Sequence, residues 1–199
     1  MFKLRPALFA LIFLIVLAGC KSEEEKAIDR MRPTAEKLTK AIEKQIKGRQ
    51  ASIPASSVLI AYDEHGVVED RDKGILPHRD CLKKLAERGI IELRVTKEPT
   101  YPTGTMERYE PSVKEAYKKY LGKVDSSEVL FVGPYKLAGV GESFEKFINE
   151  WDETKDNVWL SIKGELTDRA PWYTEEIEAV CPYWVAGPHL RYTKANGWQ

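Results

Sequence analysis

Residues 1–20 constrain this chain more than any other segment. Lys3 and Arg5 precede an apolar run over residues 7–18, and residues 17–20 read Leu-Ala-Gly-Cys. This order of positive charge, apolar run and small residues is typical of a secretory signal peptide with its cleavage site. The run has about a dozen residues, whereas a membrane-spanning helix needs roughly 20. It is therefore a poor transmembrane anchor.

Leu-Ala-Gly-Cys at the end of such a run resembles the lipobox of bacterial lipoproteins. The resemblance implies that residues 1–19 are removed as a lipoprotein signal peptide and that a diacylglyceryl group is attached to the sulfur of Cys20. It also implies that the new amino terminus is often acylated. Two or three acyl chains would hold the protein firmly, since each buried methylene contributes about 0.8 kcal/mol. The alternative is an ordinary secretory peptide with an incidental cysteine.

The resemblance places the protein in the bacterial cell envelope, facing the periplasm, with a membrane contact through the lipid on Cys20. Lys21 stands where many enterobacterial lipoproteins kept in the inner membrane have aspartate, so the outer membrane is favoured. Residues 20–26 are expected to form a polar tether, which can span only roughly 20 Å when extended. The globular part should therefore stay near the bilayer surface.

Two further cysteines, Cys81 and Cys181, lie in the globular part. In an oxidising periplasm they can pair. The bridge would close a loop of about 100 residues and contribute at most roughly 4 to 5 kcal/mol. Two buried free thiols are the alternative, and the sequence does not distinguish them.

Apolar residues at helical spacing predict an N-terminal amphipathic helix, with Pro33 in the first turn of its main part. The stripe comprises Ile28, Met31, Ala35, Leu38, Ile42 and Ile46. Residues 51–57 read as a connection because they hold Pro54 and three serines. Residues 58–62 read as a short strand.

A helix, a strand, a long turn and a returning strand follow one another in the middle of the chain. The helix should stop at Gly89, the strand alternates apolar and polar residues over 91–96, and Pro111 suits the first turn of another helix over residues 111–121. The segment over roughly residues 78–122 resembles the recognition helix and wing of winged-helix domains. DNA binding is not carried over, because an envelope address removes the DNA.

Residues 79–123 have 11 basic and 7 acidic side chains, although the chain without Lys3 and Arg5 has 29 basic and 31 acidic ones. Solvated helix faces explain this local excess, and contact with anionic head groups or an acidic envelope partner is the sharper alternative. Nucleic acid is not an expected partner.

The C-terminal half is expected to hold strands and short helices, with its clearest strand at residues 158–162. The sequence therefore predicts an α+β fold with an N-terminal helix, a winged-helix-like middle segment and a small antiparallel sheet unit. The expected divisions are a helical and winged-helix-like region over residues 27–124 and a C-terminal α+β region over residues 125–199.

Four aromatic residues flank a predicted turn without following a strand period, and they either pack in the core or line a groove for glycan, peptide or protein. They are Trp172, Tyr173, Tyr183 and Trp184. The three histidines lie in separate segments without metal-ligand spacing, and no motif indicates a catalytic residue, a metal or a cofactor.

The first functional hypothesis is a non-enzymatic envelope lipoprotein that binds or supports an envelope protein or glycan through its C-terminal half. The alternative is an envelope hydrolase acting on a cell-wall or polymeric substrate, which would need a carboxylate acid and base. No spacing of carboxylates in the sequence indicates such a pair. Two carboxylates converging in a deep pocket would favour the enzyme, and an exposed aromatic patch would favour the binding protein.

Overall fold

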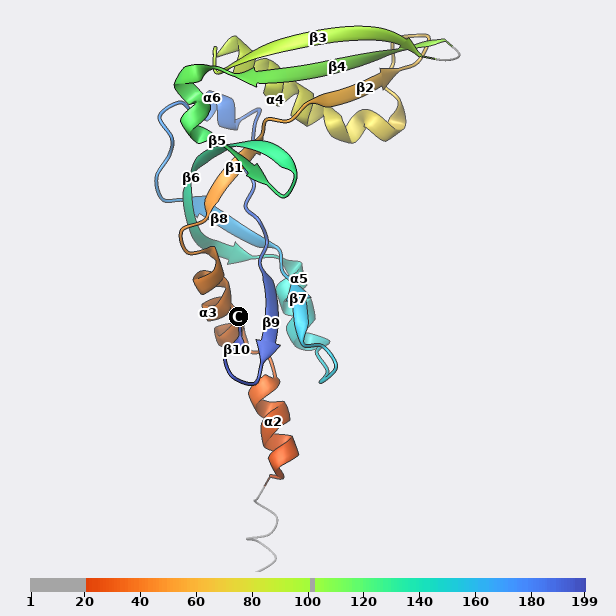
Figure 1. The fold of residues 1–199 in the computed structure, drawn as a ribbon. Helices are drawn as coiled ribbons and strands as arrows, with labels where there is room; N and C mark the ends of the chain where they lie inside the picture. Colours follow the sequence, from red (N-terminus) through yellow and green to blue (C-terminus); the bar gives the residue numbers. More distant parts are fainter. Residues whose placement is uncertain (1–20, 101–102) are drawn as a thin grey trace, which may run out of the picture.

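The structure is a computed structural model and describes residues 21–100 and 103–199. It is a mixed α+β fold whose strands pair antiparallel in the described residues. The molecule is elongated, with α2 at one end and the β2–β4–β3 sheet at the other (Figure 1). None of the helices in the described residues is long and apolar enough to cross a membrane.

Helices and strands alternate along the whole described chain. The helices are α2 (Glu23–Met31), α3 (Ala35–Ile46), η1 (Asp70–Ile75), α4 (Leu76–Glu87), η2 (Glu115–Tyr120), α5 (Glu142–Asn149) and α6 (Glu175–Glu178), of which η1 and η2 are 3₁₀ helices. The strands are β1 (Gln50–Pro54), β2 (Val58–Tyr62), β3 (Ile91–Thr100), β4 (Gly104–Val113), β5 (Leu121–Val124), β6 (Ser127–Val140), β7 (Asn157–Trp159), β8 (Ile162–Leu166), β9 (His189–Thr193) and β10 (Gly197–Trp198).

The long strand β6 organises the middle of the molecule. Its first half pairs with β1 on one side and β5 on the other, and its second half pairs with β8. The strand bends at Gly133, whose φ is +145°. A Cβ atom at this position would lie 2.0 Å from the carbonyl oxygen of Asp168. Glycine is therefore required there on grounds of both conformation and space.

The pairing of β1 with β6 corrects the expectation of a connection at residues 51–57. Ala51, Ser52 and Ile53 are all buried in β1. Ser52 also exchanges backbone hydrogen bonds with Trp184, of 3.2 Å and 3.0 Å. Partners that come from much later in the chain thus satisfy the backbone of a serine-containing strand. This pairing also crosses the expected division between residues 124 and 125.

The N-terminal helical stripe forms two helices. Pro33 lies between them, and Thr34, whose side chain accepts a hydrogen bond from the backbone N–H of Lys37, is the N-cap of α3. The prediction that Pro33 opens the main helix is therefore wrong. The apolar face of α3 packs against β6, β9 and β10, with Leu38 and Ile42 fully buried. In contrast, α2 has no buried residue.

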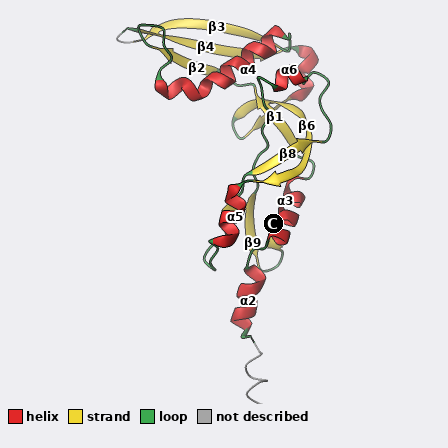
Figure 2. Ribbon diagram, turned by 180° about the vertical axis from the view of Figure 1, so that it is seen from behind, coloured by secondary structure: helices red, strands yellow, loops and turns green. Residues whose placement is uncertain are grey.

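Helix α4 covers one face of the β2–β4–β3 sheet (Figure 2). It stops as predicted at Gly89, which has a φ of +69° and lies where Ile90 donates a backbone hydrogen bond to Leu85. The helix expected at residues 111–121 is wrong. Strand β4 continues through Pro111 to Val113, followed by η2 and β5. The winged-helix resemblance expected over residues 78–122 is not confirmed.

Proline is tolerated inside β4 because of where the neighbouring strand ends. The pairing of β2 with β4 finishes at the Val58–Tyr109 pair, so Pro111 faces a partner only on the β3 side.

The strand expected at residues 158–162 also needs correction. Residues 158–162 belong to two strands, β7 and β8, which lie in different sheets. Between these strands, the buried Leu160 donates its N–H to the carbonyl of Pro188 at 3.0 Å.

A polar cluster centred on Glu107 joins all three strands of this sheet. The carboxylate accepts hydrogen bonds from the hydroxyls of Tyr62 (3.0 Å) and Tyr109, and pairs with Lys97 at 2.6 Å. Burial opposes ionisation of Glu107, but the hydrogen bonds from Lys97, Tyr109 and Tyr62 outweigh it and lower the pKa to about 2. The charged form of Glu107 therefore stabilises the fold.

Replacing Glu107 by Gln should lower the free energy of unfolding at neutral pH by about 1 to 3 kcal/mol, because a charge-assisted network is lost. The folded-state pKa lies below the ordinary value of 4.5, so the stabilisation is complete above that value and is lost as the pH falls toward 2. Denaturant unfolding measured between pH 2 and pH 7 tests this, with the exposed Glu98→Gln as control. Equal pH dependence in both variants would contradict it.

A disulfide between Cys81 and Cys181 joins α4 to the segment after α6, with the two Cα atoms 4.8 Å apart. Both residues are buried in the hydrophobic core. This core is one continuous cluster that runs from Leu38 in α3 to Leu82 and Leu85 in α4. The bridge thus fixes α4, and with it the β2–β4–β3 sheet, to the rest of the protein.

Removing the bridge in a Cys81→Ala/Cys181→Ala variant should lower the free energy of unfolding by about 3 to 5 kcal/mol, because the unfolded chain loses a long closed loop. Reductant should lower the unfolding midpoint of the native protein and leave that of the variant unchanged. If titration of the unreduced, denatured protein finds thiols at both positions, the bridge does not form.

Candidate functional site

The structure separates the four aromatic residues that the sequence grouped. Tyr173 is fully buried and donates its hydroxyl to the carbonyl of Cys181 at 2.6 Å, and Trp172 is buried beside it. Tyr183 is half-buried, and its hydroxyl donates a hydrogen bond to the carbonyl of Gly164. Only Trp184 is on the surface, with 43% of its area exposed. Of the two alternatives, core packing therefore holds for Trp172 and Tyr173.

A second tryptophan, Trp159, completes an aromatic surface with Trp184. Trp159 is 71% exposed, and both side chains line one hollow of about 490 Å³. We call this hollow the tryptophan hollow. Its polar lining includes Gln45, Arg49 and Asp125, and His189 contributes a ring. Trp159 was not among the expected binding residues, although its place on the polar side of the 158–162 alternation indicates an outward orientation.

Strand pairing positions the aromatic rings. Trp159 in β7 and His189 in β9 are cross-strand partners, and their rings stack at 4.4 Å with an interplanar angle of 18°. One face of Trp159 is therefore covered and the other is open. Gly187 allows the close approach of the two segments, because a Cβ there would lie 2.3 Å from the carbonyl oxygen of Leu160.

Polar groups at the edge of the hollow come from the end of α3 and from the β5–β6 turn. Gln45 donates its amide to the carbonyl of His189 at 2.8 Å, while its carbonyl oxygen is buried without a hydrogen-bond partner among the described residues. Arg49 follows Gly48, which ends α3, and is exposed. Asp125 occupies the turn with a φ of +54°. The hollow thus offers a cation and a carboxylate beside two flat aromatic surfaces.

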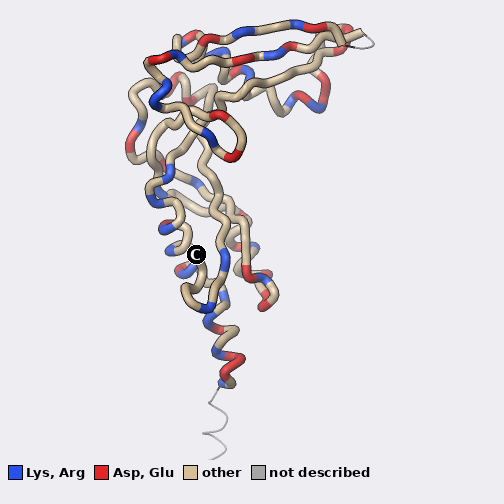
Figure 3. Tube along the Cα trace, in the orientation of Figure 1, with Lys and Arg blue, Asp and Glu red and all other residues tan. Residues whose placement is uncertain are grey.

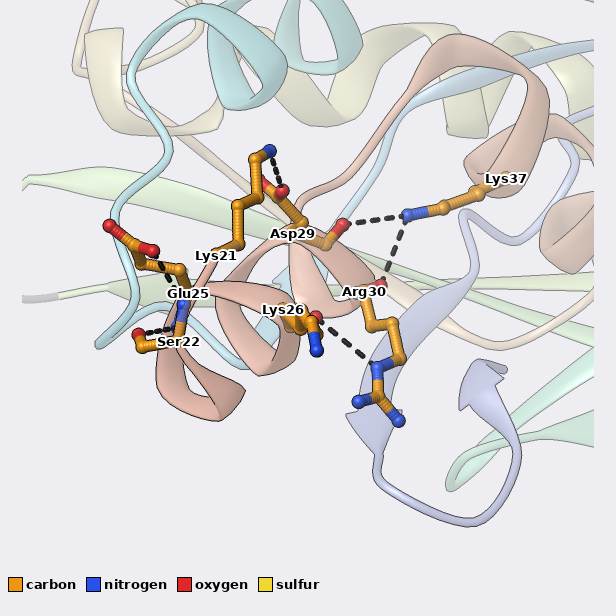
Figure 4. Close-up of polar contacts among 7 residues, drawn as sticks. All are labelled: Lys21, Ser22, Glu25, Lys26, Asp29, Arg30 and Lys37. Carbon is orange, nitrogen blue, oxygen red and sulfur yellow. Dashed lines mark hydrogen bonds and ion pairs between the residues drawn. The ribbon is translucent and has the colours of Figure 1, made fainter. Parts of the chain in front are cut away.

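Cys20, the expected lipidation site, lies outside the described residues. Only Lys21 and Ser22 separate it from α2, so residues 23–26, expected in the extended tether, form the first turn of a helix. Ser22 and Glu25 form a reciprocal capping box, with hydrogen bonds of 2.8 Å and 3.1 Å (Figure 4). Lys21 pairs with Asp29.

The other end of α2 is capped by a side chain from α3. The ammonium of Lys37 donates to the carbonyls of Asp29 (3.3 Å) and Arg30 (3.0 Å) (Figure 4). It also donates to the carbonyl of Arg32 (2.9 Å). A positive charge at the carboxyl end of a helix also interacts favourably with the negative end of the helix dipole. Polar caps at both ends therefore hold a helix in which no side chain is fully buried.

The hollow is suited to binding, and the described residues that line it include no pair of carboxylates. Asp125 is the one carboxylate among the described residues that line it. Across residues 21–100 and 103–199, no group of three or more His, Cys, Asp or Glu side chains could hold a metal ion. Comparison with protein-family models, with curated proteins and with solved structures found no match for this chain. Functional inference therefore rests on the geometry of the surface.

Proposed function

We propose that this protein is a lipid-anchored component of the bacterial envelope that binds another envelope component, without catalysing a reaction, through the tryptophan hollow. The observation that carries the proposal is the exposure of Trp159 and Trp184 at one hollow that Arg49 and Asp125 also line. Large exposed aromatic side chains with little conformational freedom are favoured at binding surfaces. Such a patch favours the binding protein over the hydrolase.

The position of α2 supports the anchored arrangement. With lipid on Cys20, α2 would stand between the bilayer and the rest of the protein, because only two residues separate them. A nine-residue helix adds about 13 Å of length. Residues 79–123, the basic stretch considered for contact with head groups, lie toward the opposite end of the molecule (Figure 1). The proposal therefore assigns them no role at the anchoring membrane.

Mass spectrometry of the membrane-extracted protein should show an amino-terminal residue 20 that carries diacylglyceryl and acyl groups. The Cys20→Ser protein should lack this mass and leave the detergent phase, while Cys81→Ser/Cys181→Ser should keep the lipid. An unmodified Cys20 in the native protein would overturn the anchor.

Binding through the hollow predicts that the Cys20→Ser protein sediments with washed envelopes. Adding Trp159→Ala and Trp184→Ala should weaken this binding by about tenfold or more, since exposed anchors each contribute over 1 kcal/mol. The exposed Leu59→Ala/Val67→Ala pair, distant from the hollow, is the control. Equal sedimentation of all variants would contradict the proposed surface, and circular dichroism would establish that each is folded.

A further inference from the structure

The tryptophan hollow continues into two further hollows along the exposed side of α3. The adjoining hollow, of about 430 Å³, shares Gln45 and His189 with it and adds Lys44 and Arg191. The third, of about 350 Å³, shares Lys44 with the second and extends past Lys40 toward α2. We call these three hollows together the α3 track. Helix α3 is about 18 Å long, so the track suits an extended ligand.

The charge of the α3 track is positive. Its lining includes six Lys and Arg side chains, and Asp125 is the one acidic side chain among the described residues that line it: the cations are Arg30, Lys37, Lys40, Lys44, Arg49 and Arg191. Basic positions recur along α3 in Figure 3. The cations are therefore concentrated on one side of this half of the molecule, although the whole chain has 31 basic and 31 acidic side chains.

Some of these cations already have partners. Lys37 caps α2, and Lys40 pairs with Glu36 at 2.8 Å. In contrast, none of the ion pairs found in the described residues involves Lys44, Arg49 or Arg191. These three side chains are free to bind an anionic ligand, and they follow the track from the tryptophan hollow along α3.

A neighbouring hollow shows that the charge is specific to this side. The hollow between α2 and β9, of about 460 Å³, is lined by Glu23, Glu24 and Glu153 as well as by Arg30 and Lys194. An extended anion would be repelled by the three carboxylates and attracted by the α3 side. Charge therefore selects one of the two surfaces that flank α2.

From these observations we infer that the α3 track binds an anionic glycan strand, an inference that rests on the proposed function and specifies its ligand. Flat sugar faces can lie on the open ring of Trp159 and on Trp184. Hydroxyl groups can donate to the carboxylate of Asp125, which lines the tryptophan hollow. Carboxylates or phosphates farther along the strand can pair with Lys44 and Arg191. A lipid head group would use the cations but would leave the tryptophans unoccupied.

The test uses the Cys20→Ser protein and three probes: purified peptidoglycan sacculi as an insoluble anionic glycan, cellulose as a neutral glycan, and phosphatidylglycerol vesicles. We expect co-sedimentation with sacculi that is at least about tenfold tighter than with the other two. Raising the salt concentration to 1 M should weaken it, because charges are screened beyond about 3 Å.

Two variants separate the parts of the track. Trp184→Ala and Lys44→Glu/Arg191→Glu should each weaken sacculus binding by about tenfold or more. The control Lys83→Glu/Arg108→Glu makes the same change in net charge on exposed residues of α4 and β4, toward the opposite end of the molecule from α2, and should bind normally. The Trp184 backbone bonds to Ser52 do not depend on its side chain, so the alanine variant should fold.

The outcomes distinguish this inference from the proposed function. Binding to washed envelopes without binding to sacculi would overturn the glycan ligand and leave the proposed function standing. Tighter binding to the vesicles, or sacculus binding that the two track variants do not weaken, would also overturn it. Loss of envelope binding altogether would overturn both.

Discussion

The bend of β6 at Gly133 determines how the layers of the protein come together. It allows one strand to pair first with β1 and β5 and then with β8. At the bend, the chain after β8 comes close enough for Ala170 to donate its N–H to Val132 at 2.8 Å. This contact directs the following segment into the core, where Tyr173 is buried and Cys181 meets α4. A side chain at position 133 would collide with the backbone of Asp168 and push the segment after β8 away from β6.

Local patterns predicted the elements that depend on neighbours in the sequence. Helix α4 with its stop at Gly89, the β3–β4 hairpin and the apolar face of α3 all follow from periodicity and end signals. The failures involve distant partners. Strand β1 depends on β6 and on the backbone of Trp184, and residues 111–113 stay extended because β3 pairs with them. No local pattern in a single sequence contains these pairings.

The candidate site shows the same division. The sequence nominated Trp184 with three other aromatics, but a tryptophan's exposure depends on what packs over it, and Trp172 is covered by Tyr120 and Tyr173. Charge was also counted along the chain, which emphasised residues 79–123. Five of the six cations of the α3 track lie within residues 30–49, a basic segment that was not singled out from the sequence. The sixth, Arg191 in β9, comes from far along the chain, and the hydrogen bond from Gln45 to His189 joins β9 to α3.

The topology has a modular consequence. Val129 in β6 pairs with Pro54 on one side and with Gly122 on the other, so the chain leaves and re-enters the β6 sheet two strand spacings apart, about 10 Å. The residues between Pro54 and Gly122, which include the β2–β4–β3 sheet, are therefore one continuous excursion of the chain whose two ends lie close together. Such an excursion can be lengthened, exchanged or grafted with little disturbance to its host. The covalent link from Cys81 to Cys181 then acts as a second attachment point that restricts how far the excursion can swing.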